Sequence, residues 1–250
     1  MYLLPYKNGG IGTVQLVLSL LFLSITLSLT GCQSTPKKQG ETNVNSRPFK
    51  LSNIAKGDID MVAETNIRLT MKMLQELAIK LYKRNPMEWR KAGYQNPQQA
   101  AEAIFTDARH DVYKLHGKRS IDALRLTFDN TFSGDRVFAF IYGMRTMILA
   151  AYKDKQSFHM LDSLDPQKIY NAARNIEVAA WKLGHDRDAH GELYLVSNQL
   201  NGPVINLSYE RTFGKLIALH DSMAQIIADK SNRTIKNVIQ GVAKMVFLPI

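Results

Sequence analysis

Apolar side chains recur at helical spacing through most of the chain. In residues 58–84, Ile67, Met71, Leu74 and Leu81 follow the i, i+4, i+7 rhythm of one buried helix face. Similar patterns predict further helices at residues 97–109, 119–130, 136–152, 166–183, 209–230 and 233–245. The predicted fold class is therefore all-α or mainly α, a single multi-helix domain over residues 49–250.

Residues with special backbone preferences mark where several of these helices begin and end. The pair Asn85–Pro86 ends the first helix, because the residue before a proline avoids helical geometry. The pair Asp165–Pro166 predicts a helix start, with the acid as N-cap and proline in the first turn. Ser133 is the expected N-cap of the helix over 136–152, and Gly184 the expected C′ residue of the helix from 166.

The segment 136–152 is apolar nearly all round, which predicts a central, buried helix. It is too short to span a bilayer, and Arg136 and Arg145 interrupt it. Gly143 within it predicts a close approach of a neighbouring helix.

The second half of the chain also contains non-helical stretches. Residues 185–192 are polar and predict a loop, and a short β-hairpin near 192–208 would pair 192–196 with 204–208 across an Asn-Gly-Pro turn. The apolar end, residues 246–250, is expected to pack back onto the domain.

The first 48 residues have a different pattern. Residues 14–29 form an apolar run that suits the core of a signal peptide better than a membrane span of about 20 residues. Residues 33–48 are polar, contain two prolines and a glycine, and have no apolar period, which predicts a flexible tether. An uncleaved signal anchor is the alternative, supported by the single positive charge, Lys7, ahead of the run.

Leu29, Thr30, Gly31 and Cys32 follow that apolar run directly. This sequence resembles the lipobox of bacterial lipoproteins. The resemblance implies that residues 1–31 are removed, that the Cys32 sulfur carries a diacylglycerol, and that 32–48 link it to the domain. Two or more acyl chains hold a protein stably on a membrane. Gln33 in place of aspartate, by similarity to enteric sorting patterns, implies the outer membrane with the domain facing the periplasm.

The remainder carries a weaker resemblance. The stretches SGDRVFAF and LDPQKIYNAARNIE and the ending FLPI resemble proteobacterial lipoproteins that have no assigned activity. This resemblance implies no substrate or cofactor.

Cysteine usage and charge limit the chemistry of the protein. Cys32 is the only cysteine, so its lipidation would exclude disulfides and thiol catalysis, and no cofactor is expected. The chain carries a net charge of +10, and half of that excess lies between residues 80 and 125. A basic face there would suit an envelope protein or an anionic lipid or lipopolysaccharide partner, and nucleic acid is excluded by the expected location. Its candidate residues are Lys80, Lys83, Arg84, Trp89, Arg90, Lys91, Lys118 and Arg119.

Two groups of polar residues are candidates for other chemistry. His185, Asp186, Asp188 and His190 are potential metal ligands, although their spacing does not match HExxH and a polar loop explains them more simply. Arg174 and Glu177 lie at i, i+3 on an otherwise apolar helix, where a structural ion pair is simpler than acid–base catalysis.

Two functions remain open from the sequence. The first is a non-enzymatic binding or scaffolding lipoprotein that acts through a basic surface. The alternative is a periplasmic enzyme, hydrolase-like, with or without a metal ion, using the 185–190 loop or a pocket near Arg174 and Glu177.

Overall fold

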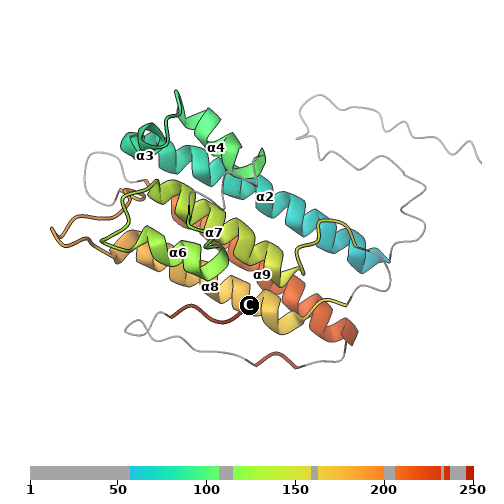
Figure 1. Ribbon diagram of the computed structural model, residues 1–250. Helices are drawn as coiled ribbons and strands as arrows, with labels where there is room; N and C mark the ends of the chain where they lie inside the picture. The colour runs from blue at the N-terminus through green and yellow to red at the C-terminus, as the bar shows by residue number, and fades with distance from the viewer. Residues whose placement is uncertain (1–56, 107–114, 159–162, 200–205, 232–233, 237–245) are drawn as a thin grey trace, which may run out of the picture. The chain divides into compact units, whose positions relative to one another are not determined.

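Seven α-helices form the regular secondary structure of the residues that the computed structural model describes (Figure 1). The described residues are 57–106, 115–158, 163–199, 206–231, 234–236 and 246–250. The helices are α2 (Asp58–Arg84), α3 (Pro86–Lys91), α4 (Pro97–Thr106), α6 (Ser120–Thr127), α7 (Arg136–Ala151), α8 (Pro166–His185) and α9 (Ser208–Ser231). The prediction of a mainly helical domain is confirmed.

The long helix α2 begins and ends where the sequence predicts. Its apolar stripe is buried, with Leu74 and Leu81 fully inaccessible to solvent. The backbone N–H of Asn85 donates to the carbonyl of Leu81 at 2.8 Å, and Pro86 then opens α3. The expected helix over 97–109 is present as α4, and residues 107–109 lie outside the described part of the chain. The helix expected at 119–130 is shorter, because α6 ends at Thr127.

Helix α7 is the central helix, as its apolar character predicts. It is buried along most of its length and packs against α2, α6 and α8 (Figure 1). Its N-cap is Asp135, whose carboxylate accepts the backbone N–H of Phe138 at 2.9 Å, so the prediction of Ser133 as the cap is wrong. The Arg136 side chain reaches back to carbonyls at the end of α6, including that of Thr127 at 2.8 Å. Those contacts hold the preceding turn outside the helix.

Gly143 of α7 makes the close approach that the sequence predicts. A Cβ atom at this position would lie 2.7 Å from the backbone nitrogen of Leu124 and 3.0 Å from the carbonyl oxygen of Ser120. Only glycine therefore allows α6 to lie this close to α7.

Helices α8 and α9 pack side by side in opposite directions. Asp165 caps α8 by accepting the N–H of Gln167 at 3.0 Å, which confirms the predicted start. The prediction of Gly184 as C′ is wrong, because the helix continues through His185 and is capped at Asp186. The ion pair between Asp186 and Lys182, at 2.8 Å, stabilises this last turn without a left-handed residue.

The segments around α9 differ in part from their predictions. The described residues contain isolated antiparallel bridges, Arg187 with Leu193 and Gln199 with Asn206, in place of a hairpin with strands at 192–196 and 204–208. The second bridge still reverses the chain ahead of α9. Of the helix predicted at 233–245, residues 234–236 are described and are not helical.

The C-terminal residues 246–250 pack back onto the domain, as predicted. Phe247 is buried and Ile250 contacts the core. Two asparagines of α8 bind the backbone of this segment: Asn171 donates to the carbonyl of Pro249, and Asn175 donates to that of Leu248, each at 2.8 Å.

Candidate functional site

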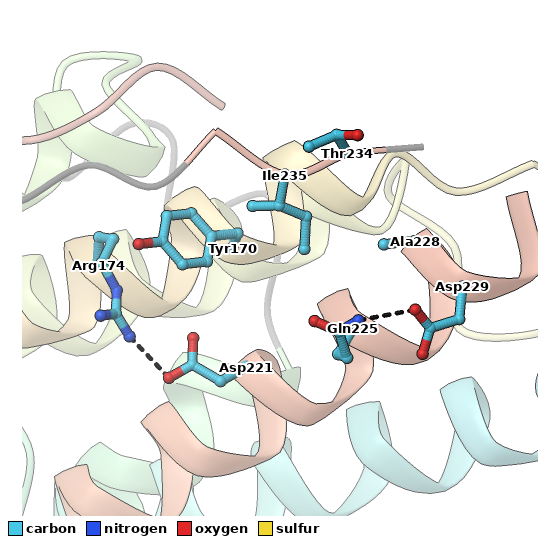
Figure 2. Close-up of a pocket in the computed structure, with 8 residues that line it drawn as sticks. All are labelled: Tyr170, Arg174, Asp221, Gln225, Ala228, Asp229, Thr234 and Ile235. Atoms are coloured by element: carbon cyan, nitrogen blue, oxygen red, sulfur yellow. Dashed lines mark hydrogen bonds and ion pairs between the residues drawn. The ribbon is translucent and has the colours of Figure 1, made fainter. Parts of the chain in front are cut away.

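Two cavities lie along the same face of the α8–α9 pair, and their lining residues are together called the groove. The smaller, of about 390 Å³, lies at the start of α8 and the end of α9 (Figure 2). The larger, of about 670 Å³, lies at the end of α8 and the start of α9, under the loop that joins them. Each helix therefore contributes one continuous face to both cavities.

An ion-pair triad stands between the two cavities. Arg174 of α8 binds Asp221 of α9 at 2.7 Å and Glu177 of its own helix at 3.1 Å. Figure 2 shows the guanidinium reaching across to Asp221 with Tyr170 beside it, and the distance to the Tyr170 ring centroid is 4.9 Å. The triad links α8 to α9 and holds one positive charge against two negative ones.

The surroundings of the triad disfavour the ionised form of Glu177. Partial burial raises the pKa of Glu177, and Asp221 raises this pKa further, whereas Arg174 lowers it. The Oδ1 atom of Asp221 is buried and has no hydrogen-bond partner among the described residues. The triad is thus one positive charge short of neutrality.

The larger cavity has an apolar floor and a polar rim. Phe213 and Ile217 of α9 and Leu193 of the loop supply apolar surface. Trp181 also lines the cavity, and its ring stacks on that of His185 with centroids 4.8 Å apart. Glu210 accepts a hydrogen bond from the side-chain amide of Asn198 at 2.7 Å. An apolar surface with a few fixed polar groups is typical of a binding site.

The four residues predicted as metal ligands do not converge. The Nδ1 atom of His185 lies 2.8 Å from the carbonyl oxygen of Trp181, and Asp186 pairs with Lys182. Asp188 accepts the backbone N–H groups of His190 and Glu192, at 2.8 and 3.0 Å, and shapes its own turn. Across the described ranges, no three His, Cys, Asp or Glu residues are placed to share a metal ion.

The residues predicted to form a basic surface are divided between two places along α7. Arg90 lies over the Trp89 ring and Lys91 pairs with Glu88, which in turn accepts the backbone N–H of Arg136 at 2.7 Å. These residues, with Lys83 and Arg84 at the end of α2, lie near the start of α7. Lys80 turns toward α9, where its ammonium group is 3.4 Å from the Ser208 carbonyl oxygen.

Lys118 and Arg119 lie near the other end of α7. Arg119 pairs with Asp154 at 2.7 Å, and the backbone N–H of Ser120 donates to Thr146. Thr146 is ten residues beyond Arg136, or about 15 Å along a helix axis. The predicted residues therefore lie in groups near the two ends of α7, with Lys80 turned toward α9.

The structure brings together groove residues that the sequence pattern singled out in separate places and others that it did not single out. Arg174, Glu177 and His185 were candidates, and all three face the groove. Asp221, Glu210 and Trp181 were not considered. The spacing of Glu210, Ile217 and Asp221 at i, i+7 and i+11 was the available signal, but a solvated helix face shows the same spacing.

The N-terminal predictions concern residues outside the described part of the chain. Cys32 and the segments 1–31 and 32–48 all precede residue 57. Within the described residues, no helix combines the length and the apolar character needed to cross a bilayer.

Comparison of the chain with known family models, curated proteins and solved structures finds no match.

Proposed function

We propose that this protein is a lipid-anchored binding or scaffolding protein of the bacterial envelope, with no catalytic role of its own. In this proposal Cys32 carries the lipid and the helical domain faces the periplasm at the outer membrane. The α8–α9 groove binds the partner. The groups of basic residues near the two ends of α7 contact anionic headgroups or lipopolysaccharide phosphates.

The observation that carries the binding role is the groove itself. It consists of two cavities on one face of two packed helices, with apolar lining from Phe213, Ile217 and Leu193 and charged groups beside it. Its charged side chains are held by structural contacts such as Arg174 with Asp221, at 2.7 Å. A preorganised groove of this kind supports recognition, because little side-chain ordering remains to oppose binding.

The support for the anchor is the lipobox-like sequence and the polar tether that follows it. The Cys32→Ala variant, expressed in a Gram-negative host, tests it. We expect an uncleaved precursor that takes up no radiolabelled palmitate, whereas Ser34→Ala is processed and labelled like the wild type. Normal processing and labelling of Cys32→Ala would contradict the anchor.

A photo-crosslinking amino acid placed in the groove tests the binding role. Leu207 is 48% exposed and lines the larger cavity, whereas Met87 of α3 is 61% exposed and lies outside it. In cells making the full-length protein, we expect a discrete crosslinked product from position 207 and none from 87.

A second substitution shows whether that product depends on the groove. Gly214 lines the larger cavity, and a Cβ there would meet no atom within 4 Å. Gly214→Phe should therefore fill the cavity without disturbing the helix pair, and abolish the product from position 207. A product that persists at full yield would overturn the groove as the binding site.

A further inference from the structure

The charge of the groove is opposite to that of the chain as a whole. Four carboxylates line the two cavities, those of Glu177, Glu210, Asp221 and Asp229. Two arginines, Arg174 and Arg187, oppose them, so the lining carries a net charge of −2 with histidine neutral, on a chain of +10. We propose that the groove binds a segment of a partner protein rich in lysine or arginine, an inference that rests on the proposed function.

Accessible carboxylates in the groove favour a cationic ligand. Arg174 pairs with both Glu177 and Asp221, so one positive charge faces two negative ones. The side chains of these two acids are 38% and 40% exposed and remain open to a second cation. A lysine ammonium or an arginine guanidinium carries only donors, and so meets the carboxylates without adding a further acceptor.

The aromatic residues of the groove add a second contact for such side chains. Stacking on His185, with an interplanar angle of 8°, fixes the orientation of the Trp181 ring at the larger cavity. A cation over a tryptophan face is attracted by the negative charge of the ring face. The aliphatic stems of lysine or arginine would cover Ile217 and Leu193 while their charged ends reach the carboxylates.

The length of the groove favours a peptide over a small amine. Tyr170 and His185, which line opposite ends of it, are fifteen residues apart on α8. This separation is about 22 Å along the helix axis. An extended peptide of about seven residues covers that distance, at about 3.3 Å per residue. A single amino group would occupy only one of the two cavities.

Fluorescence of Trp181 reports directly on occupation of the larger cavity. The chain has two tryptophans, so Trp89→Phe leaves Trp181 as the only emitter. We titrate this full-length, lipidated variant in detergent micelles with a capped heptapeptide that alternates lysine and leucine. We expect a saturable change in Trp181 emission, weakened by added salt. The same peptide with glutamate in place of lysine should leave the emission unchanged.

Two matched charge variants separate the groove from the rest of the surface. Glu177→Gln with Glu210→Gln removes two groove carboxylates, and should weaken binding of the lysine peptide at least tenfold. Asp58→Asn with Glu76→Gln removes two exposed carboxylates of α2, and should leave the affinity within twofold. A cooperative thermal unfolding transition in both double variants shows that each is folded.

Three results would overturn the inference. The first is an equal loss of affinity for the lysine peptide in both double variants. The second is a larger change in Trp181 emission with the glutamate peptide than with the lysine peptide. The third is full competition by spermidine at equal concentration, which would indicate that the ligand is a small amine. Loss of peptide binding with retention of the groove-dependent crosslink at position 207 would reject the basic partner alone. Absence of both would reject the binding function as well.

Discussion

Asn175 of α8 and Leu248 of the C-terminal segment are joined by a pair of hydrogen bonds, although 73 residues separate them in sequence. The backbone N–H of Leu248 donates to the Asn175 Oδ1 atom at 2.6 Å, and the Asn175 amide donates to the Leu248 carbonyl at 2.8 Å. Asn175 is fully buried. Its amide thus binds the end of the chain as a neighbouring β-strand would.

Replacement of Asn175 by alanine should destabilise the domain by about 1–3 kcal/mol, because the N–H and C=O groups of Leu248 lose their partner in a partly buried place. Urea unfolding followed by circular dichroism measures this loss. Asn171→Ala removes one bond to the C-terminal segment, to the Pro249 carbonyl, and one from the Gln167 amide within α8, and should cost less. Equal losses in the two variants would show that the paired geometry has no special role.

Replacement of Gly143 by alanine should destabilise the protein by about 1–3 kcal/mol, because the added methyl group overlaps the backbone of α6. Gly184→Ala is the matched control. It also lies in a helix, but a Cβ there meets no atom within 4 Å. Alanine at 184 should be neutral or stabilise by up to about 1 kcal/mol, since glycine is a poor helix former. Thermal unfolding of the pair distinguishes the close approach from helix propensity.

Asp135 should make stability depend on pH. Burial raises the pKa of this carboxyl to about 7, and Glu88 raises it further, against the hydrogen bonds from Phe138 and Tyr82 that lower it. Because the pKa is higher in the folded state than in the unfolded state, the folded state binds more protons between about pH 4 and 7. The contribution of Asp135 to stability should therefore decrease as pH rises through this window.

The variant Asp135→Asn isolates that contribution. Asparagine still accepts the N–H of Phe138 but does not titrate, so the free energy of unfolding of the variant relative to the wild type should rise between about pH 4 and about pH 7. Taking the difference between variant and wild type also cancels the effect of other titrating groups. One such group is His220, whose pKa is lowered by burial. Parallel urea titrations make the measurement. A constant difference across this range would contradict the raised pKa.

Replacement of Arg174 by glutamine should destabilise the protein by about 1–2 kcal/mol at neutral pH, since Glu177 and Asp221 lose their shared cation. The loss is moderate because both carboxylate side chains are close to 40% exposed. It should shrink at acidic pH, where the Glu177 carboxyl, whose pKa is raised by burial, becomes neutral. Arg125→Gln breaks an exposed pair with Asp122 and should change stability by less than about 0.5 kcal/mol. Equal effects of the two variants would show that the triad stabilises the helix pair no more than an exposed ion pair does.

The helices were predictable where the local pattern left one solution. The stripe of Ile67, Leu74 and Leu81 and the proline after Asn85 together set the bounds of α2. Helix ends that depend on distant partners were not predictable. Asp135 replaces Ser133 as the cap of α7 because the side chain of Arg136 binds the end of α6.

The candidate site was predictable only in fragments. Arg174 and Glu177 stood out because charged residues on a buried helix need partners. Their shared partner, Asp221, comes from another helix, and no spacing in the sequence pairs the two. The contacts of the basic residues were likewise not predictable, because Lys80 approaches Ser208 of α9 and Arg119 pairs with Asp154, both distant in sequence.

The sequence by itself determined the helical class, the buried position of α7, the start of α8 at Asp165 and the return of the C-terminal segment to the core. These features follow from local backbone preferences and from the burial of apolar surface, which act within a few turns of the chain. Only the tertiary structure decided that α8 and α9 lie antiparallel, that Arg174 meets Asp221, and that an acidic groove crosses a basic protein. Such features depend on long-range packing, which brings together side chains whose spacing in the sequence does not relate them.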